Sequence, residues 1–165
     1  MVAAALLSSA KDDWRTPAGV LRLVRQIGPS ALDPCAGEGS LVHAVREYRL
    51  DRREDGLRLP WAVGGLVFCN PPYGDAIGPW TRRIAREAAS GVEIVALLPA
   101  RVDTAWWRDV SGAPAICFWR GRLTFIGAPN PATFPSAIAY FGPRVERFVE
   151  VFAPCGWITS SRRAA

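Results

Sequence analysis

Histidine and cysteine, the usual ligands of zinc, are scarce in this sequence of 165 residues. It has one histidine and four cysteines, Cys35, Cys69, Cys117 and Cys155, with no Cys-x-x-Cys pair among them. Such a spacing offers no zinc-ligand set, and scattered thiols of this kind are typical of reduced, cytosolic proteins. The sequence therefore predicts a protein without a metal site and disfavours a metal-dependent hydrolase.

Long hydrophobic runs are also absent, since none reaches the roughly 18 residues that cross a bilayer. The apolar start over residues 2–7 has no basic residue in front of it and is too short for the core of a signal peptide. We expect residues 1–11 to form a flexible tail. We also expect a cytoplasmic protein that has no membrane partner.

Lysine is nearly missing, because Lys11 is the only lysine among 20 lysine and arginine residues, while the net charge is +5. The planar fork of arginine pairs with phosphate and with guanine edges, so an arginine-rich surface suits nucleic acid. A GC-rich coding sequence would replace lysine by arginine whatever the function. Both interpretations stay open.

Half of the residues are apolar and 21% are charged, which is enough material for one folded domain. We place it at 12–158, with a flexible tail at 159–165. The pattern predicts an α/β fold whose sheet is mostly parallel, with antiparallel C-terminal strands and helices on both faces. Predicted helices cover 17–27 with Thr16 as cap, about 41–48, 80–89, and 104–110 with Asp103 as cap. Predicted strands cover 31–33, 66–69, 92–98, 115–119, 123–126, 136–141 and 145–152.

A glycine-containing turn follows the first predicted strand, in the pattern Asp33-x-x-x-Gly37-x-Gly39. Two glycines let the backbone approach a ligand closely, and a following helix would favour polar or anionic ligand atoms. The third glycine of the dinucleotide fingerprint is missing, so a nicotinamide cofactor is not favoured. By itself, the pattern is also compatible with an ordinary tight turn.

The tetrapeptide Asn70-Pro71-Pro72-Tyr73 follows the next buried strand and is more informative. Two prolines stiffen the chain and hold the Asn70 side-chain oxygen and the Pro71 carbonyl as neighbouring acceptors. An exocyclic amino group has two N–H donors, which two such acceptors would bind. Holding both hydrogens favours a pyramidal nitrogen whose lone pair can attack. A rigid turn with an exposed tyrosine is the simpler alternative.

These residues resemble the cofactor-binding and catalytic motifs of amino-group DNA methyltransferases, and more closely still the small phage-type DNA adenine-N6 methyltransferases of the Dam-like family. The resemblance covers most of the chain. It rests on Asp33-Pro-Cys-Ala-Gly-Glu-Gly39 and Asn70-Pro-Pro-Tyr73, and on Asp13-Trp-Arg-Thr-Pro17, Asp55-Gly-Leu57, Ile77-Gly-Pro-Trp80, Leu97-Leu-Pro-Ala-Arg-Val-Asp-Thr104 with Trp106-Trp107, Gly121-Arg-Leu-Thr-Phe125 and Phe134-Pro-Ser-Ala137.

The resemblance implies a Rossmann-like methyltransferase that uses S-adenosyl-L-methionine (AdoMet) and methylates a flipped adenine in double-stranded DNA. It implies a catalytic set of Asn70, Pro71, Pro72 and Tyr73. The implied cofactor-binding residues are Trp14, Arg15, Thr16, Pro17, Asp33, Pro34, Cys35, Ala36, Gly37, Gly39, Asp55 and Asn70. Within that set, Asp33 would hold the methionine amino group and Asp55 the adenine. No clear acidic residue closes a second strand to hold the ribose, and Glu47 is a possible substitute. The resemblance also suggests a gene of a bacterium, phage or prophage, and the marking of phage DNA against restriction.

Other conspicuous residues have two interpretations each. Arg101, Asp103 and Trp106 either shape the base pocket and the approach of DNA, or belong to a capped helix on which Trp106 and Trp107 pack. Arg120 and Arg122 either contact phosphate or line a solvated hairpin. His43 is predicted to lie on the surface of a helix.

Three alternatives to the main prediction remain: methylation of RNA bases, methylation of protein glutamine, and a catalytically inactive nucleic-acid-binding relative. The length leaves little beyond a catalytic core, so we expect no separate target-recognition domain and expect recognition of DNA to fall to loops such as 99–107 or 128–135. Whether the protein is a monomer or a homodimer is open.

Overall fold

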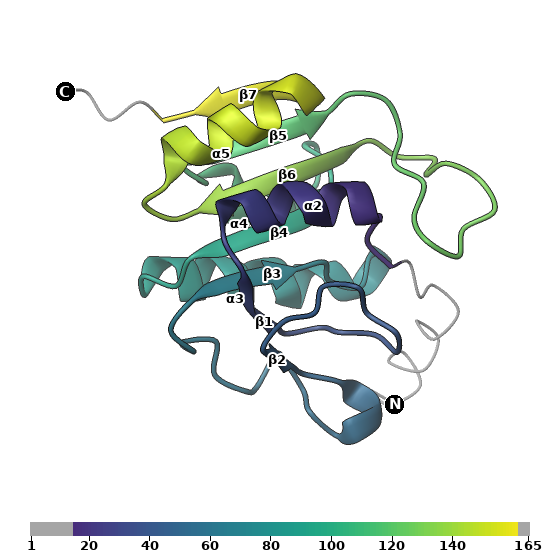
Figure 1. Cartoon of the computed structure of the whole chain (residues 1–165), viewed down its shortest axis with the longest axis vertical. Coiled ribbons are helices and arrows are strands. Elements are labelled where there is room, and N and C mark those ends of the chain that lie inside the picture. The colour runs from purple at the N-terminus through teal and green to yellow at the C-terminus, as the bar shows by residue number, and fades with distance from the viewer. Residues whose placement is uncertain (1–14, 162–165) are drawn as a thin grey trace.

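The computed structural model describes residues 15–161, which form one seven-stranded sheet with helices packed against it (Figure 1). The strand order is β2-β1-β3-β4-β6-β5-β7. The helices are α2 (Ala18–Ile27), α3 (Ile77–Ala89), α4 (Arg108–Ser111) and α5 (Val145–Phe152), with short 3-10 turns η2 (Leu50–Arg52), η3 (Gly74–Ala76), η4 (Ala105–Trp107) and η5 (Ala153–Cys155). The strands are β1 (Ser30–Asp33), β2 (Arg46–Glu47), β3 (Leu66–Cys69), β4 (Ile94–Pro99), β5 (Ala115–Trp119), β6 (Ser136–Phe141) and β7 (Gly156–Ser160).

The sheet consists of a parallel half and an antiparallel half. Strands β2, β1, β3 and β4 run in parallel, whereas the pairings of β4 with β6, β6 with β5 and β5 with β7 are antiparallel. The carboxyl ends of the parallel strands therefore share one edge, which is the edge where ligands bind in open α/β sheets. Because Pro99 pairs with Ser136, the segment 120–135 between β5 and β6 lies at the same edge.

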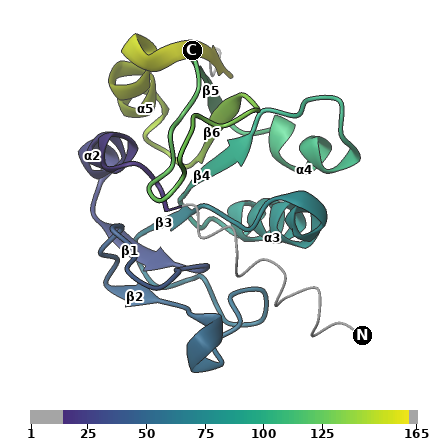
Figure 2. The ribbon, with the colours of Figure 1, turned by 90° about the vertical axis from the view of Figure 1, so that its right-hand side faces the viewer.

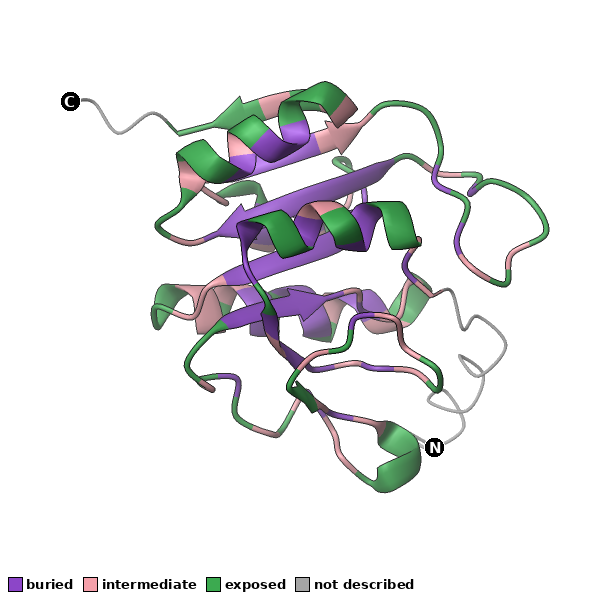
Figure 3. Cartoon of the chain, in the orientation of Figure 1, coloured by how far each residue is buried: buried purple, intermediate pink, exposed green. Residues whose placement is uncertain are grey.

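Two apolar cores lie on opposite faces of the sheet. In Figure 2, α2 and α5 stand on one side of the strands and α3 and α4 on the other. Successive residues of β4 alternate between the cores: Leu97 packs with residues of α2 and α5, and Leu98 packs with residues of α3 and α4. All positions of β3, β4 and β6 are buried as a result (Figure 3). This is why their sequences are apolar throughout.

Several predicted elements are confirmed, among them α2, α3, the strands that end at Asp33 and Cys69, and the strands at 94–99, 115–119 and 136–141. The α/β class is confirmed with them. The prediction of a mostly parallel sheet is wrong, because three of the six strand pairings among the described residues are antiparallel. Within residues 15–161, no helix is long and apolar enough to cross a membrane.

The helix predicted at about 41–48 is wrong, because this stretch is a loop followed by β2. His43 has a left-handed backbone with φ of 53°, which interrupts a right-handed helix. The backbone groups bond across the sheet instead, since Val45 N–H donates to the Ser30 carbonyl and Tyr48 N–H to the Asp33 carbonyl. His43 is exposed, but on a loop.

Two predicted strands near the end of the chain are also wrong. Residues 145–152 form α5, whose buried Phe148, Val151 and Phe152 follow the three- and four-residue spacing of a helix. Residues 123–126 are irregular and contribute a single bridge between Ile126 and Arg15. The sequence prediction missed β7, which pairs with β5 up to Ser160, so the expected domain end at 158 falls inside this strand.

Candidate active site

The two motifs singled out in the sequence meet at the carboxyl edge of the parallel half. Asp33 ends β1 and Asn70 follows β3, and the two strands are direct neighbours. The thiol of Cys35 lies 3.7 Å from the sulfur of Cys69 and donates to the Asn70 carbonyl oxygen at 3.2 Å. Burial raises the pKa of Cys35 well above its usual value, so the thiol stays protonated and acts as a donor. One neutral side chain thus joins the turn after β1 to the tetrapeptide after β3.

Asp33 is a buried carboxylate at the bottom of this edge, only 4% exposed. Its two oxygens accept from the Cys35 N–H at 3.2 Å and from the Ser40 hydroxyl at 3.3 Å. Burial, with a smaller contribution from the nearby charge of Glu47, raises the pKa of Asp33 to about 7, although the hydrogen bonds from Cys35 and Ser40 oppose the shift. A carboxyl group in this state would gain from a cationic ligand, because a nearby positive charge favours its ionised form.

The turn at 34–40 is shaped by its glycines. Gly39 has φ of +69°, a conformation that favours glycine, and a side chain there would also meet the Arg15 guanidinium at 3.3 Å. The Gly37 carbonyl accepts from Ser40 N–H at 3.3 Å and closes the turn. Within the turn, the side chains of Pro34 and Ala36 are buried.

Residues 15–17, which precede α2, lie beside this turn. Thr16 is not the helix cap that the sequence predicted, because α2 begins after Pro17 without a side-chain cap. Its hydroxyl accepts instead from the Asn70 amide nitrogen at 3.2 Å, which orients the Asn70 side chain. Arg15 and Thr16 thus lie beside the motifs, and Pro17 follows them in the chain. Their role in binding a cofactor stays a prediction, and Trp14 and the tail predicted at 1–11 lie outside the described residues.

Tyr73 is turned inward in this structure. Its hydroxyl donates to the Asn70 side-chain oxygen at 2.8 Å and lies 3.4 Å from the Leu97 carbonyl oxygen. Burial raises the pKa of the Tyr73 phenol well above its usual value, so the group is a neutral donor. The ring meets Phe125 and Phe134 edge-on, with centroids 6.1 and 5.5 Å away. Sequence reasoning assigned no chemistry to either phenylalanine, although both are aromatic residues in a segment rich in glycine and proline.

Glu47 and Asp55 are the two acidic residues that the sequence offered for the ribose and the adenine of the cofactor. Glu47 ends β2 and pairs with Asp33 in the register of the sheet, so an acidic residue does close a second strand. The incorrect helix at 41–48 concealed that position. The Asp55 carboxylate accepts from Leu57 N–H at 2.9 Å and forms an ion pair with Arg58 at 3.3 Å.

The remaining predicted residues lie farther out. Arg101 and Asp103 are exposed after β4, and Asp103 does not cap the following turn, which begins after Thr104 without a side-chain cap. Trp106 is half-buried, with its ring centroid 5.8 Å from that of Trp107. The Arg120 guanidinium donates to the Pro154 carbonyl at 2.6 Å and holds η5.

Arg122 is exposed on the segment 120–135. Within residues 15–161, no three His, Cys, Asp or Glu side chains come together as metal ligands.

Comparison with known proteins identifies one family. The family model described as DNA N-6-adenine-methyltransferase (Dam) matches residues 3–137. The matched span contains both motifs and all of the parallel half, and it ends within β6. No curated protein and no solved structure gives a significant match.

Proposed function

Since the chain belongs to the DNA N-6-adenine-methyltransferase (Dam) family, we propose that it transfers a methyl group from AdoMet to the N6 amino group of a flipped adenine in double-stranded DNA. The observation that carries the proposal is the contact between the two motifs. Cys35 of the Asp33 turn donates to the carbonyl of Asn70, the first residue of the tetrapeptide. A ligand held on the turn would therefore lie next to the acceptors of Asn70 and Pro71.

The residues around the turn fit AdoMet. Asp33 would bind the methionine amino group, because its buried carboxyl has a raised pKa and a cation would relieve the cost of ionising it. Gly37 and Gly39 would form the floor, and Arg15, Thr16 and Pro17 one wall, with Pro34, Cys35 and Ala36 beneath. Glu47 would accept from the ribose hydroxyls, and Asp55 would contact the adenine of the cofactor. When bound, AdoMet supplies a methyl group already activated by the sulfonium charge.

Asn70 and Pro71 would hold the amino group of the target base. The Asn70 side-chain oxygen and the Pro71 carbonyl oxygen accept its two N–H donors, so the nitrogen lone pair points to the methyl group. Linear alignment of nitrogen, carbon and sulfur is the main contribution, and orientation can supply roughly 7–11 kcal/mol in favourable systems. Positive charge would develop on the nitrogen as its bond to the methyl carbon forms and the carbon–sulfur bond breaks. The same acceptor oxygens would stabilise that charge until the nitrogen releases a proton to solvent.

Tyr73 would leave its present position when a base enters. Its hydroxyl now donates to the same Asn70 oxygen that the amino group needs, and it takes one of the two acceptor positions of that oxygen. Turned outward, the ring would stack on the flipped adenine and add cation–π attraction of roughly 0.5–2 kcal/mol. Pro72 stiffens the chain that carries it. Base flipping costs a few kcal/mol, which contacts to phosphate must offset.

Contacts to DNA would come from the loops at the same edge of the sheet. Arg101 follows β4 and Arg122 lies in the segment between β5 and β6, and both are exposed. The segment after β4 begins at Pro99 and the segment 120–135 ends before Ser136, and these two residues pair in the sheet. Arg120 is a weaker candidate for phosphate, because its guanidinium already donates to Pro154. Asp103 and Trp106 would border the approach of the base.

The experiment is methylation with labelled AdoMet. The protein is incubated with adenine-containing duplex DNA, RNA or a protein extract, and the product is digested and identified. Label in N6-methyladenine of DNA supports the proposal. Label found only in RNA or in protein glutamine overturns the choice of substrate, and absence of AdoMet binding in calorimetry overturns the methyltransferase activity.

Asn70→Ala should lower kcat about 10²- to 10³-fold, as removal of one group that stabilises transition-state charge does. The matched control is Gln26→Ala, which also removes a side-chain amide. Gln26 is exposed near the C-terminal end of α2, whereas Thr16, the partner of Asn70, precedes the N-terminal end of that helix. The control should keep full activity. An Asn70→Ala protein that is folded and fully active would exclude the side-chain amide from the reaction.

A further inference from the structure

The segment 55–61 follows η2 and contains no strand or helix, yet it is tightly held. The Pro60 carbonyl accepts from the Tyr48 hydroxyl at 2.6 Å, and the Gly56 carbonyl accepts from the Trp61 indole N–H at 2.8 Å. Tyr48 and Trp61 are both buried. The segment contains Asp55, the residue proposed to contact the cofactor adenine.

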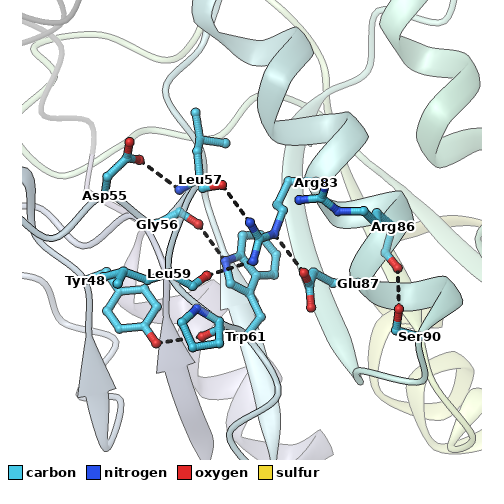
Figure 4. A network of polar contacts seen from close by, with 11 residues as sticks. Tyr48, Asp55, Gly56, Leu57, Leu59, Trp61, Arg83, Arg86, Glu87 and Ser90 are labelled. Atoms are coloured by element: carbon cyan, nitrogen blue, oxygen red, sulfur yellow. Dashed lines mark hydrogen bonds and ion pairs between the residues drawn. The ribbon is translucent and has the colours of Figure 1, made fainter.

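Arg83 of α3 holds the middle of this segment (Figure 4). Its two terminal nitrogens donate to the carbonyls of Leu57 and Leu59 at 2.6 and 2.7 Å. Its Nε lies 2.8 Å from a Glu87 carboxylate oxygen, and its guanidinium lies 5.6 Å from the centre of the Trp61 ring. A buried charge must be paired and hydrogen-bonded to be tolerated. The buried Arg83 is paired with Glu87 and hydrogen-bonded through its two terminal nitrogens.

The other side of the segment touches the turn after β1. Gly56 packs so closely on Pro34 that a Cβ there would lie 1.8 Å from the Pro34 carbonyl oxygen. Pro34 follows Asp33 directly in the chain, so the segment 55–61 connects α3 to the cofactor turn. Displacement of the segment would move both Asp55 and the support of Pro34.

We infer that Arg83 is a positioning residue for AdoMet: it acts through the segment 55–61 to hold Asp55 and the turn at Pro34 in the geometry that binds the nucleoside end of the cofactor. This rests on the proposed function. An arginine suits the task because its planar fork reaches two carbonyls at once, which the single ammonium of lysine does not reproduce. Packing alone would need only an apolar side chain of similar volume.

The test compares AdoMet binding and turnover in three variants and one control. Arg83→Met removes both donors, Arg83→Lys keeps the charge, and Gly56→Ala leaves Arg83 intact but forces the segment away from Pro34. The matched control is Arg86→Met, an exposed arginine one turn along the same helix. Calorimetry gives the Kd for AdoMet at a temperature where circular dichroism shows folded protein, and initial rates give kcat and the KM for DNA.

We expect the Kd for AdoMet to rise about tenfold in Arg83→Met and in Gly56→Ala and by less in Arg83→Lys. The kcat at saturating AdoMet and the KM for DNA should change by less than about threefold, since Asn70 and Tyr73 are not moved. Arg86→Met should match the wild type. A role in stability alone would lower the melting temperature and leave the Kd of the folded fraction unchanged.

A folded Arg83→Met protein whose Kd for AdoMet stays within about twofold of the wild type overturns the inference. If Arg83→Met does not fold, Gly56→Ala and Arg83→Lys decide in the same way. Failure of the proposed function has a different signature, because the wild type itself would then neither bind AdoMet nor methylate DNA.

Discussion

The parallel and antiparallel halves of the sheet carry different kinds of residue at the same edge. The parallel half supplies the polar groups, with Asp33, Glu47 and Asn70 at or just beyond the ends of β1, β2 and β3. The antiparallel half supplies apolar support, since Phe125 and Phe134 of the segment between β5 and β6 enclose the Tyr73 ring. One half would therefore perform the chemistry, and the other would shape and close the place where it occurs.

The family match does not extend over the whole antiparallel half. It covers the parallel half and the segment 120–135 and stops within β6, before α5 and β7. These last two elements cover the end of the sheet farthest from Asp33. Changes in them should therefore affect stability, whereas changes near β1 and β3 should affect binding and turnover.

The largest effect is expected from the core of the antiparallel half. Phe148 is fully buried in α5 and stacks on Tyr140 and Phe152, with centroids 5.1 and 4.6 Å away. Phe148→Ala should lower the free energy of unfolding by about 3–5 kcal/mol, measured by urea denaturation. The kcat of the folded fraction should stay near that of the wild type. A large loss of kcat in folded protein would contradict the division between the halves.

A second prediction concerns the pH dependence of the parallel half. Because burial raises the pKa of Asp33 to about 7, the native state keeps a proton that the unfolded chain releases above its usual pKa of 3.8. The free energy of unfolding should therefore fall as the pH rises from about 4 to 7, by up to about 4 kcal/mol, and then level off. The measurement is denaturation at several pH values in the wild type and in Asp33→Asn, which does not titrate there. Identical pH curves for the two proteins would contradict the prediction.

AdoMet binding should depend on pH with the opposite sign. The cofactor ammonium favours the ionised Asp33, so affinity should increase as the pH rises towards and through 7. Asp33→Asn should bind more weakly and lose this dependence. Calorimetry across that range checks both effects and shows whether the buried carboxyl faces the ligand.

The smallest effect is expected from Tyr73→Phe, which keeps the ring and removes the hydroxyl that donates to Asn70. Loss of one hydrogen bond should cost about 1 kcal/mol of unfolding free energy. The kcat should remain within about threefold, because the proposed stacking on the base needs only the ring. A loss as large as that of Asn70→Ala would mean that the hydroxyl takes part in the reaction, and kinetics on matched protein preparations separate these outcomes.

Much of the parallel half could be predicted because its signals are local. The apolar run 66–69 is followed at once by Asn70-Pro71-Pro72-Tyr73, and the run that ends at Asp33 is followed by the glycine-containing turn. Buried strands and proline- or glycine-containing turns depend on neighbouring residues, so their positions follow from the sequence. The errors arose where the pattern was ambiguous. Residues 41–48 suggested a helix that sheet pairing prevents, and residues 145–152 suggested a strand where packing on the sheet selects a helix.

The contacts that complete the site could not be predicted in this way. The pairing of Arg83 with Leu57 spans 26 residues of chain, and that of Asn70 with Thr16 spans 54. Thr16 was predicted to cap a helix, which is the usual local role of threonine at such a position. The structure uses its hydroxyl to hold Asn70 instead.

The sequence by itself determined the α/β class, the two motifs and the order in which they occur, because these depend on residue type and short spacing. The tertiary structure alone decided that the motifs touch through Cys35 and that Glu47 closes a strand beside Asp33. It also decided that the Tyr73 hydroxyl donates to the Asn70 side-chain oxygen. Such contacts join segments far apart in the chain, and their formation depends on strand order and packing. The proposed activity would need no metal, because its reactive group would be the sulfonium of AdoMet, and the scarcity of histidine and cysteine had led to the same prediction.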